Sequence, residues 1–379
     1  MNRPAAPAQA ERRALVLKMR PGETGRDGRI LPVREKNVIL RGPDYSRDFR
    51  CLAAACPRTC CAGWEVTVDD DTAARYLALP GPFGGRLRAE LTREDGERCF
   101  RRTAERRCPF LDGTGLCEIH CRLGEDATPA TCRAHPRFTD DWGPLRETSL
   151  AASCPAAARL LLGSRNALTF PAEETAERAG AWTEPQVPYL LAFREQMLDL
   201  LRDRTRPLRE RMAWYLLLAN QAQALLDAGA AEELPDRIAL PPSLPEPVRA
   251  QREGIFPFAL RFLAEQEVLE PDWPALLRTA ESDAPPLPEW MGERVLCYFT
   301  FRYFLRAAAD GDLLSRAELA VFSLLTAERL AGCSASPEEA LSRYCRETEH
   351  CRENLRRLQE AFCRREELSL ARFFGTLGL

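Results

Sequence analysis

Clustered cysteines are the feature that most restricts how this chain can fold. Of its 15 cysteines, ten lie between Cys51 and Cys154. In a reducing cytoplasm, cysteines clustered in this way indicate metal binding or catalysis more often than disulfides. Thiolates are soft ligands that suit zinc and iron–sulfur centres. The sequence therefore predicts a module that is held together by a bound ion or cluster.

The spacing of these cysteines argues against the common metal motifs. No CxxC pair occurs in the chain, which disfavours zinc ribbons and thioredoxin-like sites. The radical S-adenosylmethionine pattern CxxxCxxC also fails, because Gly63 stands where its third cysteine would be. Adjacent side chains tend to diverge, so of Cys60 and Cys61 one could bind an ion while the other packs or serves a second site. A purely structural zinc site is the alternative to a functional one.

The sequence divides into three parts. Residues 1–36 are rich in Pro, Ala, Arg and Gly without periodicity, and predict a disordered leader. Residues 37–165 form the cysteine-rich module, which is dense in Gly and Pro and contains two short helices near residues 71–79 and 83–92. Residues 166–379 form a helical domain.

Apolar residues at three- and four-residue spacing predict the helices of the C-terminal part. The longest of these helices, over residues 337–364, carries one continuous apolar stripe. Strand signals are few. We predict a mainly α fold, with an irregular cysteine-rich N-terminal module that holds a metal cluster, followed by a multi-helix C-terminal region. The predicted helices cover residues 150–162, 188–203, 207–228, 249–266, 288–309, 316–331 and 337–364.

Charge and hydropathy argue against two classes of partner. The net charge of −3 and the pI near 5.9 give no support for bulk electrostatic binding to nucleic acid. No apolar run approaches the roughly 18 residues that span a bilayer. The N-terminal segment lacks the continuous apolar region of a signal peptide. We therefore expect a cytoplasmic protein with no nucleic-acid partner and no membrane partner.

Cysteine-containing segments occur in a recognisable order between Pro43 and Leu162, and another, SRYCRETEHCRENL, lies in the last long predicted helix. Together these segments resemble the flagellin lysine N-methylase family. Shorter cysteine-cluster proteins share parts of the first half, so the C-terminal segment favours the longer family. The segments of the first half are PDYSRDFRC, CPRTCCAGWEVTVDDDT, CPFLDGTGLCEIH, LGEDATPATCRAHPRF and RETSLAASCPAAARLLL.

The resemblance implies a protein-lysine N-methyltransferase that acts on flagellin with S-adenosylmethionine and a [4Fe–4S] cluster. Eight cysteines match the family pattern, whereas Cys99 and Cys121 are extras of this sequence. One cubane cluster needs only four ligands, so either some of the eight are structural or two metal sites exist. The matched cysteines are Cys51, Cys56, Cys60, Cys61, Cys108, Cys117, Cys132 and Cys154.

Methyl transfer to lysine requires a neutral amine. Free lysine has a pKa near 10.4, so its deprotonation at pH 7 costs roughly 4–5 kcal/mol. A base or an apolar pocket must offset that cost. The candidate bases are Glu147 in the cysteine-rich module and Glu349 with His350 in the last long helix, with Glu125 and Asp126 as further acids.

The similarity to the family's Arg–Glu–x–Glu–His segment favours functional roles for Arg346, Glu349 and His350, although helical spacing alone equally fits a solvated charged face. No GxGxxG follows a strand, so the Rossmann signature is absent, and we assign cofactor binding to Arg137 and Arg346. His135 and Arg137 follow Cys132 closely and could either tune a cluster or stabilise their loop. The alternative to an enzyme is a non-enzymatic zinc or iron–sulfur protein with a structural or redox-sensing role.

Overall fold

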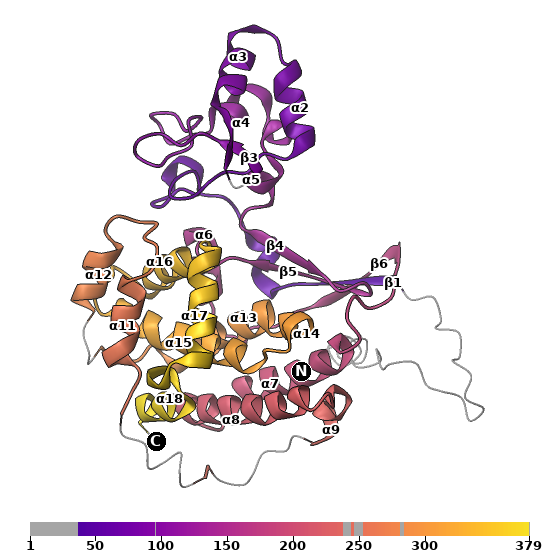
Figure 1. Ribbon diagram of the computed structural model, residues 1–379, viewed down its shortest axis with the longest axis vertical. Coiled ribbons are helices and arrows are strands. Elements are labelled where there is room, and N and C mark those ends of the chain that lie inside the picture. The colour runs from indigo at the N-terminus through magenta and orange to yellow at the C-terminus, as the bar shows by residue number, and fades with distance from the viewer. Residues whose placement is uncertain (1–36, 95, 238–243, 246–252, 281–283, 379) are drawn as a thin grey trace, which may run out of the picture.

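The computed structural model describes residues 37–94, 96–237, 244–245, 253–280 and 284–378. The predicted leader lies outside these residues. Helices make up most of the described elements, so the chain is mainly α as predicted. Figure 1 shows a small upper lobe, in indigo and magenta, above a larger body of helices. Among the described residues, no helix is both long enough and apolar enough to cross a membrane.

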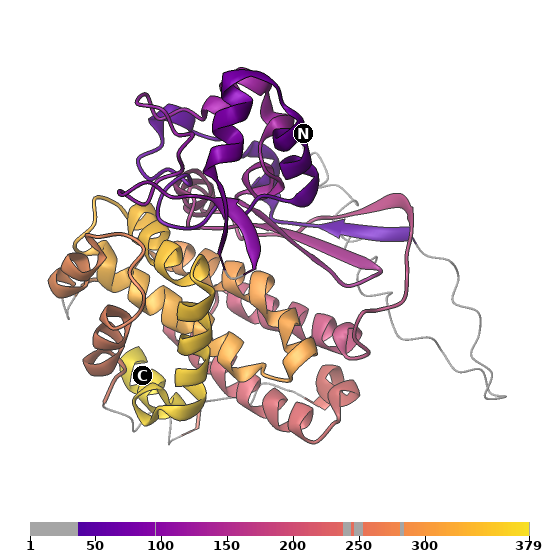
Figure 2. The ribbon, with the colours of Figure 1, turned by 45° about the horizontal axis from the view of Figure 1, so that its top comes forward.

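A four-stranded mixed sheet adjoins the junction of lobe and body (Figure 1, Figure 2). Its strand order is β4-β5-β1-β6; β1 is parallel to β5 and antiparallel to β6, while β4 and β5 form a hairpin. Strand signals are few because β4 and β6 are polar strands that expose most of their side chains. The strands cover Asn37–Arg41 (β1), Arg137–Asp141 (β4), Leu145–Leu150 (β5) and Ala172–Arg178 (β6).

The cysteine lobe, which we define as residues 56–135, has a small apolar core of its own around Val66, Tyr76 and Phe110. Both helices predicted here form, each shifted by one or two residues. The elements of the lobe are α2 (Asp70–Ala78), α3 (Gly81–Glu90), β2 (Leu91–Glu94), β3 (Glu97–Phe100), α4 (Glu118–Leu123) and α5 (Ala130–Ala134).

Asp69 ties together two helices of the lobe. One carboxylate oxygen caps α2 by accepting a hydrogen bond from the Thr72 amide at 3.0 Å. The other accepts from the Ala130 amide at 2.7 Å, at the start of α5. This aspartate therefore serves both as an N-cap and as the link that holds the Cys132-bearing helix against α2.

The helical body surrounds two central helices, α13 and α15, which bury residues on all their faces. Such all-round burial is typical of a helix at the centre of a large core. Helix α15 packs against α8, α13, α16 and α17. The helices of the body are α6 (Pro155–Leu162), α7 (Val187–Arg202), α8 (Leu208–Asp227), α9 (Leu234–Arg237), α11 (Phe256–Ala264), α12 (Trp273–Thr279), α13 (Glu289–Tyr303), α14 (Ala307–Asp310), α15 (Leu314–Ala331), α16 (Pro337–Glu349), α17 (Arg352–Arg364) and α18 (Leu370–Leu377).

Four predicted helices differ from the structure. The one predicted over residues 249–266 covers only Phe256–Ala264 among its described residues, and the one predicted over residues 288–309 is interrupted by a 3₁₀ turn between α13 and α14.

The other two differ at their start or in continuity. The helix predicted from residue 150 starts at Pro155, because Leu150 ends strand β5 and the residues between form a turn. The single helix predicted over residues 337–364 is two helices, α16 and α17, separated at His350 and Cys351. Both halves of the predicted apolar stripe stay buried, so periodicity alone could not reveal the break.

The predicted boundary at residue 165 does not separate two cores. Strands β1, β4 and β5 precede it, yet they form one sheet with β6 beyond it. Leu145 and Leu161 share the main core with residues of α7, α13 and α15. The second core belongs to the cysteine lobe alone. The described chain therefore divides into the lobe and a helical body that also contains the sheet.

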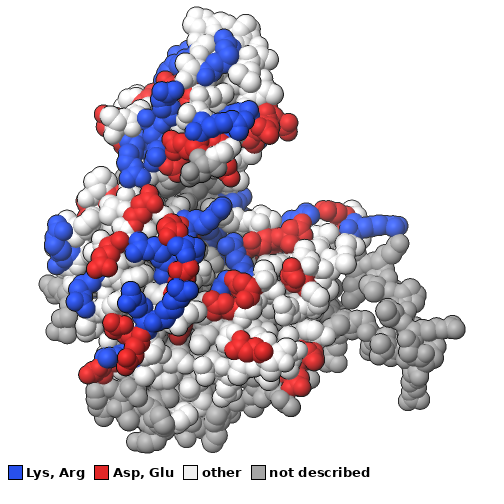
Figure 3. Space-filling view, in the orientation of Figure 1, with Lys and Arg blue, Asp and Glu red and all other residues white. Residues whose placement is uncertain are grey.

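Basic and acidic side chains are interleaved over the surface of both parts (Figure 3). Arg146 is typical, with one nitrogen 2.9 Å from Asp141 and another 3.0 Å from Glu177. Exposed pairs of this kind contribute about 0–1 kcal/mol each. They disperse the charge of an arginine-rich surface more than they stabilise the fold.

Candidate active site

All 15 cysteines are free thiols, and the eight matched ones meet where the lobe joins the body. The loop that enters the lobe carries Cys51, Cys56, Cys60 and Cys61, and Cys154 caps the first turn of α6. The remaining three come from the far side of the lobe: Cys108 from an irregular segment, Cys117 from the start of α4 and Cys132 from α5.

Four of these thiols are mutual neighbours inside the lobe. The Cys108 amide donates a hydrogen bond to the Cys61 carbonyl at 2.7 Å, which brings these two residues together. Asp112 then shapes the turn before Cys117 by accepting a hydrogen bond from the Leu116 amide at 2.9 Å. Burial raises the pKa of the Cys132 thiol, and the three other thiols, those of Cys61, Cys108 and Cys117, raise it further.

A second group of thiols lies at the entrance of the lobe. Burial raises the pKa of the Cys154 thiol, and the neighbouring thiols of Cys56 and Cys51 raise it further. The thiols of Cys60 and Cys61 do not diverge as expected: they lie close enough for the pair to raise the pKa of Cys60 and lower that of Cys61. Cys60 also interacts with Cys132 in the first group and with Cys51 in the second. The adjacent Cys60–Cys61 pair therefore lies between the two groups of thiols.

The donor set fits an iron–sulfur cluster better than a single ion. Among the described residues, no three His, Cys, Asp or Glu side chains are arranged around one metal ion. A cubane cluster is larger than an ion and holds its four thiolates farther apart. Neighbouring thiols are the donor type that iron–sulfur clusters use.

Arg346 fastens the cysteine loop to helix α16. Its guanidinium donates hydrogen bonds to the carbonyls of Thr59, at 2.9 Å, and Ala62. It forms an ion pair with Glu270 at 3.0 Å and covers the Trp64 ring at 4.5 Å from the centroid. With 4% of its side chain exposed, Arg346 belongs to no solvated face. Its contacts are with the loop that carries Cys60 and Cys61.

Gly63 makes this close approach possible. Its φ of +99° lies in the region that favours glycine, and a Cβ at this position would meet the Arg346 guanidinium at 3.4 Å. Arg58, on the same loop, adds a second attachment to the body through Glu270 at 2.7 Å and Glu339 at 3.2 Å. The loop is thus held from several directions.

His350 lies at the break between α16 and α17, against the same loop. Its ring stacks on Trp64, with centroids 4.2 Å apart and planes 11° apart, and lies 5.4 Å from the His135 ring. Its Nε2 shares a hydrogen bond with the Ser153 hydroxyl, next to Cys154. Burial, followed by neighbouring charges, holds the pKa of His350 well below its usual value. Burial, followed by the charges of Arg346 and a second arginine, lowers the pKa of His135 to about 4.

Glu349 points from the same turn into the body. Its carboxylate accepts a hydrogen bond from the Tyr298 hydroxyl at 2.9 Å and forms an ion pair with Arg302 at 3.2 Å. Tyr298 in turn accepts a hydrogen bond from the Ala152 amide at 2.9 Å. Burial raises the pKa of Glu349, against the opposing charge of Arg302. The network connects Glu349 to the turn that carries Ser153.

The structure brings Arg346, Glu349 and His350 together with the cysteines, but not Glu147. The Glu147 carboxylate is buried in the sheet and bound by Arg194 through both oxygens, at 2.7 and 2.5 Å. Arg137 lies on the exposed face of β4, with its guanidinium 5.1 Å from the Phe49 ring centroid.

Sequence reasoning gave no role to three residues of this site. Trp64 lies inside the cysteine segment CPRTCCAGWEVTVDDDT, and its place there was the only indication of a role. Ser153 likewise lies inside a matched segment, next to Cys154. Glu270 had no signal, because its importance depends on contacts between segments far apart in the chain.

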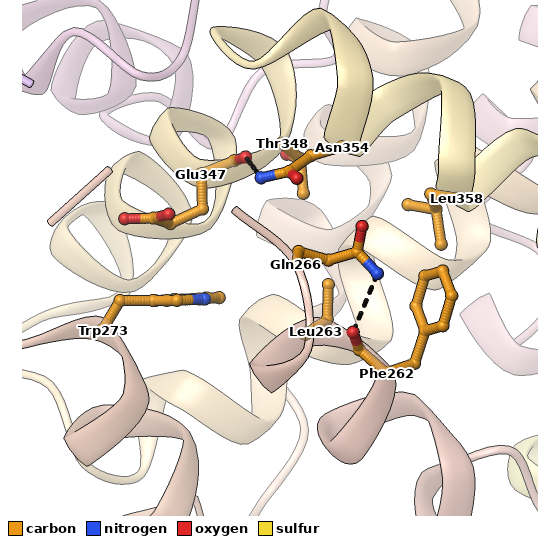
Figure 4. A pocket seen from close by; sticks show the side chains of 8 residues that line it. All are labelled: Phe262, Leu263, Gln266, Trp273, Glu347, Thr348, Asn354 and Leu358. Carbon is orange, nitrogen blue, oxygen red and sulfur yellow. Dashed lines mark hydrogen bonds between the residues drawn. The ribbon is translucent and has the colours of Figure 1, made fainter. Parts of the chain in front are cut away.

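The cavity beside Glu347 is not a substrate pocket (Figure 4). Its volume of about 10 Å³ is room for roughly one water molecule. The Glu347 carboxylate accepts hydrogen bonds from the amides of Leu269 at 2.9 Å and Glu270 at 2.7 Å. Asn354 closes the other side by donating to the Glu347 carbonyl at 2.9 Å. The residues around this cavity pack tightly and support the candidate site structurally.

Comparison with known proteins finds similarity to proteins named for lysine methylation and flagellar biosynthesis. The chain is 26% identical over 149 residues to the flagellar biosynthetic protein FliU of Salmonella muenchen, a match covering 38% of this chain and 88% of that protein. It is 26% identical over 159 residues to lysine-N-methylases of Salmonella choleraesuis and Salmonella typhimurium.

Those two matches cover 40% of this chain and 39% of each methylase, so the chain spans about two fifths of the length of these relatives. The chain matches no protein-family model. It also matches no solved structure. The similarities are distant and partial, and they agree with the resemblance found in the sequence.

Proposed function

We propose that the chain is a protein-lysine N-methyltransferase that modifies flagellin with S-adenosylmethionine and a [4Fe–4S] cluster. The observation that carries the proposal is the contact between α16 and the cysteine loop. Arg346 and His350, which the sequence placed in a family-like segment, lie against the residues around Cys60 and Cys61. Similarity to proteins named lysine-N-methylase supports the same reaction.

In this proposal Cys61, Cys108, Cys117 and Cys132 hold the cluster, because they are neighbouring thiols in one lobe. If only three of these four thiols bind iron, the remaining iron of the cluster would be open to the amino and carboxylate groups of S-adenosylmethionine. Arg346 keeps the Cys60–Cys61 loop in place through its carbonyl contacts. Its role here is positioning, in contrast to the direct cofactor contact assigned from the sequence.

The environment around His350 disfavours positive charge, which is what a lysine substrate requires. Burial together with the charges of Arg346 and Arg302 lowers the pKa of both histidines. A lysine ammonium placed beside them would experience the same effects, which offset part of the roughly 4–5 kcal/mol that deprotonation costs. The neutral amine then attacks the methyl carbon, the carbon–sulfur bond breaks, and S-adenosylhomocysteine leaves. The first proton of the ammonium passes to water before the attack, and the methylated nitrogen then loses its second proton to water, because the lowered pKa of His350 makes it a weak base.

The test is mass spectrometry of flagellin co-expressed with this chain, supplied with methionine that carries a labelled methyl group. We expect labelled methyl mass on flagellin lysines with the native chain and a strong reduction with His350→Gln. A matched control is Arg356→Ala, which removes an exposed arginine paired only with Glu353 and Glu360 in α17. Unmodified flagellin beside a fully folded, cluster-loaded native chain would refute the proposed reaction.

The second candidate is a non-enzymatic zinc or iron–sulfur protein with a structural or redox-sensing role. The observation that favours it is the presence of two neighbouring thiol groups joined by Cys60 and Cys61. Iron and acid-labile sulfide measured after anaerobic purification separate a cluster from zinc. Stoichiometric metal combined with unmodified flagellin would favour this candidate over the enzyme.

A further inference from the structure

An open pocket lies in the helical body, away from the cysteine lobe. Its lining residues come from the end of α8, the turn between α14 and α15, the start of α15 and the end of α17. Its volume is about 320 Å³, which is room for a small organic group. Carboxyl groups dominate its polar lining, whereas Leu314 and Phe362 supply an apolar wall. The lining carboxyl groups belong to Asp227, Asp310, Asp312 and Glu318.

Glu318 sets this pocket apart from an ordinary acidic surface. The residue is only 3% exposed, yet it lines the pocket, and its carboxyl group has no hydrogen-bond or ion-pair partner within the part of the chain that the structure describes. A buried carboxyl without a partner costs free energy, and such groups are exceptions that call for a functional reason. A cationic ligand would supply the missing partner.

The other carboxylates have partial partners and leave the pocket negative. Arg316 pairs with both Asp310 and Asp312, so one positive charge serves two carboxylates. Asp227 accepts a hydrogen bond from the neutral Gln223 amide at 2.7 Å. No lining residue carries a positive charge.

Gln223 makes the pocket rigid before any ligand arrives. Besides Asp227, its amide nitrogen binds the Gly311 carbonyl at 2.8 Å. Its oxygen accepts hydrogen bonds from the Leu313 amide at 2.8 Å and the Leu314 amide at 3.0 Å. These bonds fix the α14–α15 turn against α8. A preformed site loses little entropy on binding.

We propose that this pocket binds an alkylammonium group, either the side chain of a lysine in a partner protein or a free polyamine. The ammonium would lie against Glu318 and Asp227, and its hydrocarbon stem against Phe362 and Leu314. A bare metal ion fits less well, because among the described residues no three donor side chains surround one point. The proposal is independent of the proposed methyltransferase activity, since none of these residues belongs to the candidate active site.

The test is a calorimetric titration of the full chain with spermidine and, separately, with a short lysine-containing peptide. The same peptide with its lysine acetylated is the control ligand. We expect saturable binding of at least one amine, no binding of the acetylated peptide, and about tenfold weaker binding by Glu318→Gln, as the loss of one charged hydrogen bond predicts. Tighter binding of the peptide identifies a partner's lysine as the ligand, and tighter binding of spermidine a polyamine.

Glu360→Gln is the matched protein control, because it removes one carboxylate from helix α17, which also lines the pocket, at a solvent-accessible site outside the pocket. We expect it to bind as the native chain does. Glu318→Gln keeps the shape of the side chain and removes an unpartnered acid, so its unfolding midpoint should not fall. Absence of saturable binding by the native chain, or equal binding by folded Glu318→Gln, would overturn the proposal.

Discussion

At the scale of single residues, Arg346 joins more parts of the candidate site than any other side chain described above. Its guanidinium binds two carbonyls of the cysteine loop, one carboxylate of the body and the face of one indole ring. A planar guanidinium can satisfy such a set, whereas the compact ammonium of lysine cannot. The loop between Arg58 and Ala62 therefore depends on this particular side chain.

Arg346→Lys should therefore weaken retention of the proposed cluster while keeping the charge. We expect iron and sulfide per chain to fall, and stability to fall by about 1–3 kcal/mol in Arg346→Ala, where the Thr59 and Ala62 carbonyls lose their donor while Glu270 keeps Arg58. Urea unfolding and metal analysis measure the two effects. Arg356→Ala should change neither, and equal metal content in Arg346→Lys and the native chain would contradict the clamping role.

Glu347 makes stability depend on pH. Burial raises its pKa from 4.5 to about 7, against two backbone amides that lower it. The folded state therefore holds a proton that the unfolded state has lost, and the contribution of Glu347 to stability falls as the pH rises from 4.5 to about 7. Glu347→Gln removes this titration.

The stability of Glu347→Gln relative to the native chain should thus increase by about 3 kcal/mol across that pH range. Urea unfolding at several pH values checks this. Glu360→Gln, at an exposed site, should follow the native curve. Parallel curves for Glu347→Gln and the native chain would show that Glu347 is ionised throughout.

At the scale of elements, the break between α16 and α17 shapes the site. Cys351 caps α17 by accepting a hydrogen bond from the Asn354 amide at 3.4 Å. The Asn354 side chain then bonds to the Glu267 carbonyl at 2.8 Å and the Glu347 carbonyl at 2.9 Å. The two helices are thereby fixed at an angle, and His350 projects from the corner toward Trp64.

Asn354→Ala should loosen this corner. It removes the hydrogen bonds of the Asn354 side chain and leaves the buried carbonyls of Glu267 and Glu347 unpaired. We therefore expect a loss of about 2–4 kcal/mol in the free energy of unfolding. Denaturant unfolding measures it. The exposed neighbour Arg352→Ala is the control and should change stability by about 0.5 kcal/mol or less. A similarly small loss for Asn354→Ala would mean that the corner is held by apolar contacts.

Most helices of the body, and helices α2 and α3 of the lobe, could be predicted from the sequence. Each of these helices buries one regular face or all of its faces. Strands β4 and β6 could not be predicted, because their polar sequences pair through the backbone. The break at His350 could not be predicted, because the apolar stripe continues through both α16 and α17. For the site, motif order indicated the cysteines, Arg346 and His350, but Glu270 enters only through long-range contacts.

At the scale of the whole molecule, two parts with apolar cores of very different size meet at the candidate site. The body has a large core around α13 and α15, whereas the lobe buries only a small cluster around Tyr76 and Phe110. Small cores supply only a few kcal/mol and commonly need a metal or disulfides in addition. The lobe has no disulfide, since all 15 thiols are free.

Removal of the proposed cluster should therefore loosen the lobe and leave the body intact. The amides of Val68, Phe100 and Cys108, which bond within the lobe at 2.8, 3.1 and 2.7 Å, should exchange with solvent faster after treatment with a chelator and reductant. Amides of α15 should keep their protection. Hydrogen exchange followed by mass spectrometry measures both. Unchanged exchange across the lobe would show that it folds without a cluster.

Helix α16 begins at the Ser336 cap, whose hydroxyl accepts a hydrogen bond from the Glu339 amide at 3.2 Å, and it ends at Glu349. Each residue of an α-helix turns the next by about 100°. An insertion or deletion of one residue between the cap and Arg346 would swing Arg346, Glu349 and His350 away from their targets together. Evolution of this segment is therefore constrained in length as well as in composition: substitutions on its surface are tolerable, but a change in the number of residues is not.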